Sequence, residues 1–329
     1  MPRRYEPPLT LTAPMLSSVA AISEQLGRWS VTEGARLTPQ LRRENRIRTI
    51  QASLAIENNT LSVEQVTAVL VGKRVLGLPR EIREVRNAFA AYEQLEAWQP
   101  ASADNLLAAH GVLMAGLVDR PGHYRSGDVG IYRDQKLLHM APQARRVPKL
   151  IDDLLHWLAH TELHALIASC VFHYEFEFIH PFEDGNGRMG RLWQTLILSR
   201  WQPVLAWLPV ETVIRARQVE YYSALAAADK VGEATPFVLF MLDALRAAMA
   251  EASVASTKKA AKGSEKGSDK SSEKILSLLR RSPQLSAREL ADKLRLTPRA
   301  VEKQIATLRK AGRLRRIGPA KGGHWETRG

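Results

Sequence analysis

One twelve-residue segment, residues 180–191, combines side chains that phosphoryl or nucleotidyl transfer requires. Its sequence is HPFEDGNGRMGR. His180 can be neutral near pH 7 and accept a proton from an attacking hydroxyl group. Asp184 offers the carboxylate oxygens through which Mg²⁺ binds together with substrate phosphates. A base and a metal ligand thus occur within one short segment, which predicts the transfer of a phosphorus-containing group.

The same segment contains the parts of an anion site. Gly185 and Gly187 flank Asn186 and permit backbone conformations and close approaches that larger residues block. The apolar spacing that follows predicts a new helix, whose unpaired amides and positive dipole end favour a bound anion. Arg188 and Arg191 are three residues apart and can reach the same side of that helix. We therefore expect the segment to hold a chain of phosphates.

Each part of this pattern also has an ordinary structural interpretation. A lone histidine is more often structural than catalytic, the sequence Asp-Gly-Asn-Gly is common in turns, and arginines on helices are usually solvated. The combination of a base, a carboxylate, a glycine-bounded Asn and two arginines at these offsets would seldom arise by chance. The functional interpretation is therefore favoured.

A helical body must position the segment. Eight stretches of residues 1–250 have apolar residues at helical spacing: 18–29, 39–57, 62–71, 80–97, 102–114, 147–160, 163–178 and 187–200. Residues 129–140 contain two short apolar arms around a polar centre, which predicts a small β-hairpin. The sequence thus predicts an all-α body with one β excursion.

The positive charge of the chain is concentrated near its C-terminus. The net charge is +13, from 47 Lys and Arg against 34 Asp and Glu. Residues 251–329 hold 20 and 8 of these residues, a net of +12, so residues 1–250 have a net charge of only +1. This division predicts that nucleic acid, or another polyanion, binds the C-terminal segment.

The C-terminal segment divides into a linker and a small module. Residues 256–272 contain no apolar side chain larger than Ala, which predicts a flexible linker. Three further stretches have helical spacing, at 273–281, 287–294 and 298–311, and residues 314–326 have the pattern of a hairpin. We therefore expect four regions: an N-terminal helical region (1–100), a core (101–255), the linker (256–272) and a module (273–329).

The segment 180–191 resembles the signature of the Fic family, His-x-Phe-x-Asp/Glu-Gly-Asn-Gly-Arg-x-x-Arg, at every defined position. The similarity extends to residues 122–125, to the helix around His173 and to Tyr221-Tyr222. This resemblance implies a Fic-type helical bundle whose members mostly transfer AMP from ATP to a Ser, Thr or Tyr hydroxyl of a protein. It also implies ATP as the substrate and Mg²⁺ as the cofactor.

The resemblance implies a role for each residue of the signature. His180 would be the base, Phe182 a core anchor and Asp184 the Mg²⁺ ligand. Asn186 and the loop amides would hold the α- and β-phosphates, and the two arginines would grip the outer phosphates. The ATP-binding residues would thus be Gly185, Asn186, Gly187, Arg188, Arg191 and Tyr222, the last beside the adenine. The hairpin would be the flap along which a target segment pairs.

Residues 53–58, SLAIEN, match the family's inhibitory pattern Ser/Thr-x-x-x-Glu-Gly/Asn. Ser53 and Glu57 share a helix face, and Asn58 tolerates the left-handed conformation that ends helices. Glu57 could then pair with Arg191 and deny it to the γ-phosphate, which would leave the α-phosphate misaligned for attack. The alternative is an exposed glutamate at a helix end, which is common.

Residues 273–329 resemble a winged helix-turn-helix domain. In that family the third helix typically enters the DNA major groove and the hairpin wing follows the backbone. Arg299, Lys303 and Gln304 would then face bases, and Lys321 would face a phosphate. Winged helices also serve as protein-binding or dimerising modules, and this alternative stays open.

These patterns together predict a cytoplasmic protein adenylyltransferase that is autoinhibited through Glu57. Its expected partners are a protein substrate with a target hydroxyl and DNA, and a homodimer could place the brake in trans. The longest uncharged stretch, 7–23, holds three prolines, so no membrane span is expected. Two alternatives remain: a Fic enzyme that transfers another phosphate-containing group or removes AMP, and a DNA-binding regulator whose body senses nucleotide.

Overall fold

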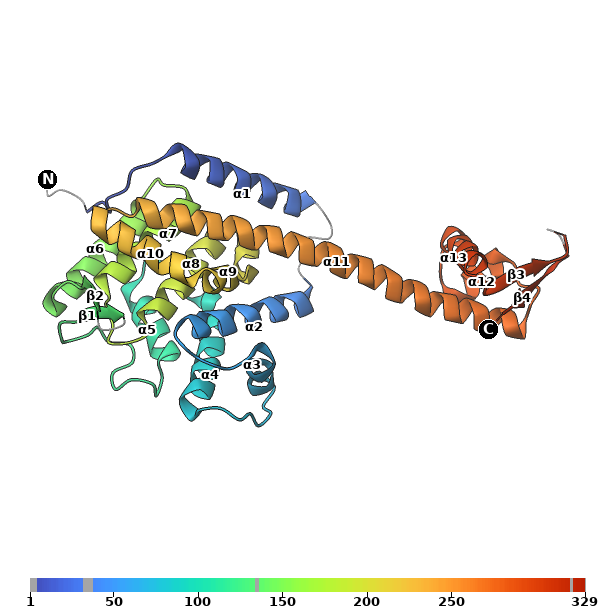
Figure 1. Ribbon diagram of the computed structural model, residues 1–329, viewed down its shortest axis with the longest axis horizontal. Helices are drawn as coiled ribbons and strands as arrows, with labels where there is room; N and C mark the ends of the chain where they lie inside the picture. The colour runs from blue at the N-terminus through green and yellow to red at the C-terminus, as the bar shows by residue number, and fades with distance from the viewer. Residues whose placement is uncertain (1–4, 32–37, 134–135, 320–321, 329) are drawn as a thin grey trace. The chain divides into compact units, whose positions relative to one another are not determined.

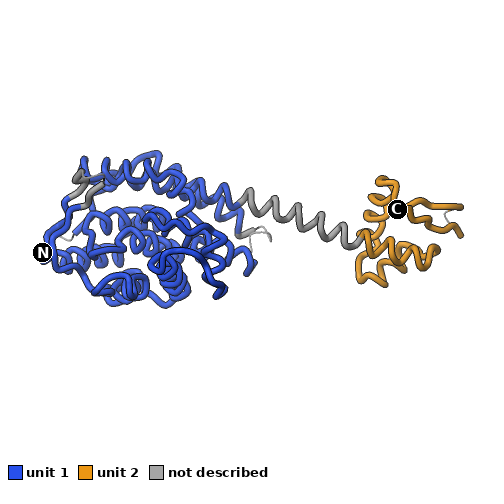
Figure 2. Tube along the Cα trace, turned by 60° about the horizontal axis from the view of Figure 1, so that its bottom comes forward, with its two compact units in different colours: residues 1–252 blue, residues 253–329 orange. Residues whose placement is uncertain are grey.

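The computed structural model describes residues 5–31, 38–133, 136–319 and 322–328. Side chains are described over the same ranges except at 30–31, 131–133, 136–139 and 253–271. The chain divides into two compact units, Met1–Ala252 and Ser253–Gly329 (Figure 2). In the described residues, no helix has the length and apolar character needed to cross a membrane.

Unit 1 is a bundle of helices (Figure 1). They are α1 (Ala13–Val31), α2 (Pro39–Ile56), α3 (Val63–Leu70), α4 (Pro79–Glu93), α5 (Ala103–Leu113), α6 (Val147–His160), α7 (Ala165–Ile179), α8 (Asn186–Trp201), α9 (Val210–Ala216), α10 (Gln218–Val231) and the first part of α11 (Thr235–Arg281). Short 3₁₀ turns lie at Leu95–Ala97, Ala144–Arg146 and Pro203–Trp207. The predicted all-α body is therefore confirmed.

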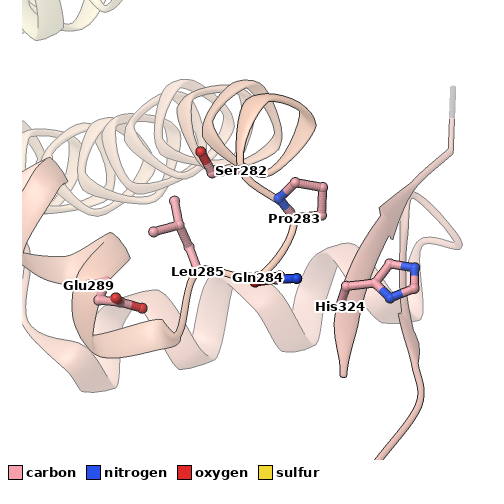
Figure 3. Close-up of a pocket in the computed structure, with 6 residues that line it drawn as sticks. All are labelled: Ser282, Pro283, Gln284, Leu285, Glu289 and His324. Atoms are coloured by element: carbon pink, nitrogen blue, oxygen red, sulfur yellow. The ribbon is translucent and has the colours of Figure 1, made fainter. Parts of the chain in front are cut away.

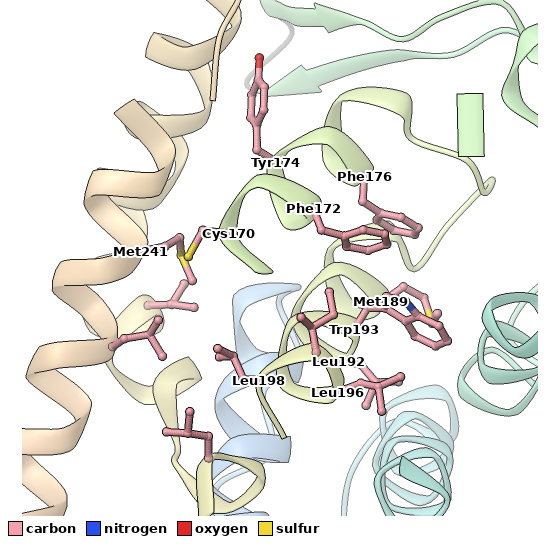
Figure 4. Close-up of a cluster of buried hydrophobic side chains, with 14 of the residues drawn as sticks. Cys170, Phe172, Tyr174, Phe176, Met189, Leu192, Trp193, Leu196, Leu198 and Met241 are labelled. Atoms are coloured by element: carbon pink, nitrogen blue, oxygen red, sulfur yellow. The ribbon is translucent and has the colours of Figure 1, made fainter. Parts of the chain in front are cut away.

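The core of unit 1 lies around α7 and α8, which pack against each other. Both helices are buried along most of their length, although α8 also buries polar residues such as Arg188, Arg191 and Gln194. Phe172 and Phe176 of α7 lie near Met189 and Trp193 of α8 (Figure 4). This packing fixes the C-terminal end of α7 and the N-terminal end of α8, and the segment 180–185 joins these two ends.

The predicted hairpin is present as β1 (Gly130–Arg133) and β2 (Lys136–Met140). The strands are antiparallel, with Gly130 opposite Met140, and the register shifts between Ile131 and Tyr132. The tip of the predicted hairpin, residues 134–135, lies outside the described residues.

Several helix boundaries differ from the sequence prediction. The helix expected from residue 18 starts at Ala13, because Pro14 is tolerated in the first turn, where its missing N–H has no intrahelical partner. The helix expected to reach residue 97 ends at Glu93 and is followed by a 3₁₀ turn. The sequence analysis did not predict α9 and α10, and α10 buries only Tyr221 and Ala228, so its apolar pattern is weak.

Unit 2 contains the end of α11, α12 (Ala287–Leu294), α13 (Pro298–Lys310), β3 (Leu314–Ile317) and β4 (His324–Thr327). The strands form an antiparallel hairpin that pairs Leu314 with Thr327. A separate apolar core holds these elements together: Ile275, Leu276, Leu279, Leu290, Ala291, Val301, Ile305, Leu308 and Leu314. Three helices and a hairpin are the elements of a winged helix, as predicted.

The segment expected to be a flexible linker differs from the prediction. Residues 256–272 are helical and form the middle of α11. Lys, Ala and Glu, which have high helix propensity, make up about half of this stretch. The boundary between the two units, after Ala252, lies close to the predicted start of the linker.

Candidate active site

The loop between α7 and α8 is held in one conformation by its own residues. His180 ends α7 with a left-handed backbone (φ 50°), and Pro181 disfavours further helix. The Asn186 side chain accepts a hydrogen bond from Phe182 N and donates one to Phe182 O, both at 2.9 Å. Gly185 has a φ of +87°, which favours glycine. The loop is therefore braced without a ligand.

The start of α8 provides backbone donors for an anion. The first hydrogen bond within the helix runs from Met189 N to Gly185 O, so the amides of residues 186–188 lack intrahelical acceptors. The positive end of the helix dipole points the same way. A Cβ atom on Gly187 would clash with Oε1 of Glu57. A carboxylate therefore already lies beside this helix start, in space that only a glycine leaves open.

Arg191 connects this helix to residues 53–58, the segment that matches the inhibitory pattern. Its Nε donates to Ser53 Oγ at 3.0 Å, and its Nη2 donates to Ser53 O at 3.0 Å and to Glu57 Oε1 at 2.8 Å. Burial alone would lower the pKa of the Arg191 guanidinium, but Glu57, together with Tyr221 and Glu177, more than offsets this, so that pKa is raised. Asn58 has a φ of 68°, as expected for the end of α2. The ion pair predicted from the sequence is therefore present.

Asp184 lies in a second network of charges. Its Oδ1 accepts hydrogen bonds from Gly185 N at 2.6 Å and from Arg188 Nη2 at 2.8 Å. Its Oδ2 accepts one from Arg80 Nη2 at 2.9 Å. Arg188 is almost fully buried and also contacts Glu84 Oε1 at 3.3 Å. Two arginines and a backbone amide thus neutralise the predicted metal ligand in this structure.

The backbone of His180 is tied to the base of the hairpin through Arg125. The Nε of Arg125 donates to His180 O at 2.8 Å, and its Nη1 donates to Gly127 O at 2.8 Å. Its Nη2 donates to Pro142 O, on the other side of the hairpin. The His180 side chain is half-buried. One buried guanidinium therefore fixes the expected base and the expected flap relative to each other.

The comparisons with known proteins agree with this geometry. A family model described as "Fic/DOC family" matches residues 100–198. The crystal structure of a Fic family protein from Desulfovibrio desulfuricans G20 is 51% identical, and the match covers 99% of both chains with a TM-score of 0.75. This chain belongs to the Fic family. A second model, described as an HTH domain, matches residues 272–318.

Curated Fic proteins are more distant relatives. The protein adenylyltransferase fic-1 of Caenorhabditis briggsae is 30% identical over 221 residues, which are 61% of this chain and 40% of the relative. The protein of the same name from Caenorhabditis elegans is 28% identical over 246 residues, 69% of this chain and 44% of the relative. The match thus spans less than half the length of these curated relatives.

His110 supports the Fic loop from outside, a role that sequence reasoning missed. Gly122 N donates to its Nδ1 at 2.9 Å, so Nε2 carries the proton and lies 3.1 Å from the backbone oxygen of Asp184. The ring stacks on Phe182, with centroids 3.6 Å apart. Burial lowers the pKa of His110 to about 4, so the side chain is neutral. No sequence signal marked this lone histidine on a helix.

The two adjacent tyrosines have different positions. Tyr221 is buried, and its hydroxyl lies 3.2 Å from Nε2 of His173. Tyr222 is half-buried, and burial, followed by the negative charge of Glu57, raises the pKa of its hydroxyl. The expected place of Tyr222 beside the adenine stays a prediction.

Two residues of the Fic signature make contacts in the structure that the sequence did not predict. Both polar atoms of the Asn186 side chain bond to the backbone of Phe182, so Asn186 shapes the loop. Its expected contact with a phosphate stays a prediction. The Arg188 guanidinium lies against Asp184 and Glu84 rather than beside Arg191. The sequence spacing could not distinguish these contacts, because both residues are close to the expected anion site.

In unit 2, the predicted nucleic-acid contacts are only partly exposed. Arg299 and Lys303 are exposed on α13. Gln304 is half-buried, and its Oε1 accepts a hydrogen bond from Ser272 Oγ at 2.6 Å. The expected contact of Gln304 with bases stays a prediction. Gln304 lies at the edge of the face of α13 that packs in the core of unit 2, because its neighbours Val301 and Ile305 belong to that core. Lys321 lies outside the described residues.

Two surface pockets contain none of the predicted residues. One lies in unit 2 and is lined by Ser282, Pro283, Gln284, Leu285, Glu289 and His324 (Figure 3). The other lies in unit 1 between the N-terminal segment and α6, and its lining includes Tyr5, Trp157 and His160. Neither pocket combines the base, carboxylate and arginines found at the loop.

Proposed function

We propose that this chain transfers AMP from ATP to a Ser, Thr or Tyr hydroxyl of a protein and that Glu57 inhibits the reaction. One observation carries the proposal: within a complete Fic signature, the Glu57 carboxylate lies against Gly187 and pairs with Arg191. A carboxylate in this position marks an anion site at the start of α8. The names of the curated relatives support adenylyl transfer as the reaction.

In the proposed reaction, the hydroxyl oxygen attacks the α-phosphorus of ATP. A bond forms between that oxygen and the phosphorus, the bond to the bridging oxygen breaks, and pyrophosphate leaves. His180 takes the proton of the hydroxyl. Arg125 keeps His180 beside the hairpin, on which the target segment would pair. The amides at the start of α8 and Arg191 would hold the phosphate chain.

Asp184 fits the Mg²⁺ that ATP would bring. Its carboxylate is partly exposed, with 41% of the side chain accessible, and carboxylate oxygens suit this ion. Among the described side chains, no group of three or more His, Cys, Asp or Glu residues could hold a metal without further ligands. This suits an ion whose other ligands are phosphate oxygens and water. When bound, Mg²⁺ would offset the charge of the phosphates.

Glu57 would inhibit by occupying a guanidinium that the γ-phosphate needs. Arg191 is buried, so a phosphate can reach it only where Glu57 now lies. Nucleotide would still bind with the γ-phosphate displaced, and the α-phosphate would then miss the in-line position. A charged hydrogen bond of this kind is worth about 1.5–3 kcal/mol, which corresponds to about 10- to 100-fold in rate if it is lost on activation.

The test is AMP transfer by the variant Glu57→Gly. Incubated with ATP and Mg²⁺ and weighed intact, it should gain AMP about 10- to 100-fold faster than the wild type, by automodification. A gain of a phosphate or of a different nucleotide would favour the other Fic reactions. Absence of any increase over the wild type would contradict inhibition by Glu57.

The matched control is the double variant Glu57→Gly/His180→Ala. Loss of the base should lower transfer by about 10²- to 10⁴-fold, while ATP binding measured by calorimetry stays detectable. Unchanged transfer in this variant would remove His180 from the role of base.

We further propose that unit 2 binds duplex DNA. The match to the HTH model and the exposed Arg299 and Lys303 on α13 support this proposal. Arg299 lies near the start of α13, the end of a recognition helix that typically contacts base edges. The basic charge of this part of the chain would supply affinity for phosphates.

A further inference from the structure

Arg80, which the sequence patterns did not single out, forms an ion pair with Asp184, the carboxylate expected to bind Mg²⁺. Arg80 is the second residue of α4, and its Nη2 lies 2.9 Å from Oδ2 of Asp184. The other oxygen of Asp184 is taken by Gly185 N and Arg188. Arg188 and the amide belong to α8 and its N-cap. Among the contacts of the described residues, the one from the region before residue 100 is that of Arg80.

Arg80 is held at Asp184 by a connected set of contacts. Its Nε lies 3.5 Å from Oε1 of Glu84, one turn along α4. The same oxygen contacts Arg188 at 3.3 Å, and Oε2 accepts a hydrogen bond from Asn59 Nδ2 at 2.8 Å. Asn59 is buried and follows Glu57 by two residues. The segment that contains Glu57 is thus connected to Asp184 through Glu84.

The Glu57–Arg191 contact and the Arg80–Asp184 contact are complementary in charge. At Arg191, the carboxylate of Glu57 lies where a phosphate is expected. At Asp184, the guanidinium of Arg80 lies where a divalent cation is expected. In this structure the N-terminal region therefore places one anion and one cation at the two positions where the proposed substrate would place its own.

We propose that Arg80 is a resident counter-cation that competes with the divalent metal for Asp184. This inference rests on the proposed function, because it assigns the metal to Asp184. The Arg80 side chain is 59% exposed, so it can turn into solvent when the metal binds. Arg80 thereby lowers the affinity of the loop for metal, independently of the Glu57 contact.

The experiment measures how much a metal strengthens binding of ADP to the full-length chain. ADP lacks the γ-phosphate, so the Glu57–Arg191 pair can stay closed during the measurement. Calorimetry gives the dissociation constant of ADP with EDTA and with Mn²⁺, and the ratio of the two is the metal-dependent gain. Arg80→Gln should raise this gain about two- to fivefold, the worth of a partly exposed ion pair.

Two further variants separate the contact from general charge. Arg83→Gln removes a positive charge from the same helix, but Arg83 donates to Gly116 O rather than to Asp184. It should leave the gain within about 1.5-fold of wild type, as expected for a screened exposed charge. In an Asp184→Asn background, Arg80→Gln should have no effect, because the shared partner is gone.

The inference is overturned if Arg80→Gln leaves the gain unchanged or lowers it, or if its effect persists with Asp184→Asn. The proposed function can fail separately. If the chain transfers no AMP but Arg80→Gln raises the metal-dependent gain, only the proposed function is contradicted. If the chain transfers AMP but Arg80→Gln leaves the gain unchanged, only the competition by Arg80 is contradicted. A chain that binds no ADP under either condition overturns both.

Discussion

At the scale of single residues, the site depends on partners that fix charge and protonation before any nucleotide binds. His110 accepts from Gly122 N through Nδ1, so its proton is on Nε2, next to the carbonyl of Asp184. A protonated ring would lose this acceptor and would place a charge in a buried environment. The position of Asp184 therefore depends on His110 staying neutral.

We predict that the lowered pKa of His110 makes the folded chain less stable in mild acid. Its pKa is about 4 in the folded chain and near 6.5 when unfolded, so between these values the unfolded state binds the additional proton. The free energy of unfolding should therefore fall as pH drops from 6.5 to 4, by up to about 1.4 kcal/mol per pH unit, and this contribution should level off below 4. Urea unfolding at a series of pH values measures it.

The variant His110→Gln isolates this effect. Glutamine keeps a donor and an acceptor but does not titrate, so the fall between pH 6.5 and 4 should be shallower than in the wild type. His123→Gln, at an exposed histidine of the same region, should keep the wild-type slope. Equal slopes for the wild type and His110→Gln would contradict the assignment.

At the scale of elements, the connection between α7 and α8 shows what local sequence can predict. Pro181 and Gly185 mark the end of one helix and the start of the next, and both lie within the segment they shape. The Glu57–Arg191 contact was predictable because Ser53 and Glu57 share a helix face and match the family's inhibitory pattern. Short-range signals were therefore sufficient for the loop, whereas the one long-range pair was predicted through the resemblance to the family.

The remaining contacts of the site could not be predicted from the sequence. Arg80 is 104 residues from Asp184, and His110 is 74 residues from it. A lone arginine or histidine on a helix has many ordinary positions, and nothing local specifies a partner so distant. The hydrogen bond between Gln304 and Ser272, 32 residues away, could not be predicted for the same reason. Tertiary packing decides these cases.

Loss of the two hydrogen bonds between Asn186 and Phe182 should lower both the stability of the chain and its activity. Asn186→Ala removes two hydrogen bonds to Phe182 and leaves buried backbone groups without those partners. The free energy of unfolding should fall by about 1–3 kcal/mol, and AMP transfer in the Glu57→Gly background should fall because the loop loses its shape. Thermal unfolding and intact mass measure the two effects.

Asn105→Ala is the matched control for this brace. Asn105 accepts a hydrogen bond from Gln99 N at 2.7 Å near the start of α5. Its loss should lower stability without changing the transfer rate of the folded protein. A transfer rate that is unchanged in Asn186→Ala would show that the loop needs no brace.

At the scale of the whole molecule, two units with different electrostatics are joined in one chain. Residues 251–329 have a net charge of +12, against +1 for residues 1–250. Unit 2 also has its own apolar core, separate from that of unit 1. Affinity for a polyanion should therefore depend on substitutions in unit 2 and be insensitive to those at the loop of unit 1.

The affinity of the full-length chain for duplex DNA should depend on which arginine of unit 2 is changed. Arg299 is exposed on α13, whereas Arg313 pairs with Glu273 Oε1 at 2.8 Å. Arg299→Gln and Arg313→Gln each remove one positive charge, so long-range attraction falls equally.

If Arg299 neutralises a phosphate, only its variant should lower the slope of log affinity against log salt, by about 0.9 for that one phosphate. If Arg299 instead reads a base, affinity falls without a change in slope and discrimination between sequences weakens. Equal behaviour of the two variants in both respects would mean that α13 does not face the DNA, and would favour a protein-binding role for unit 2.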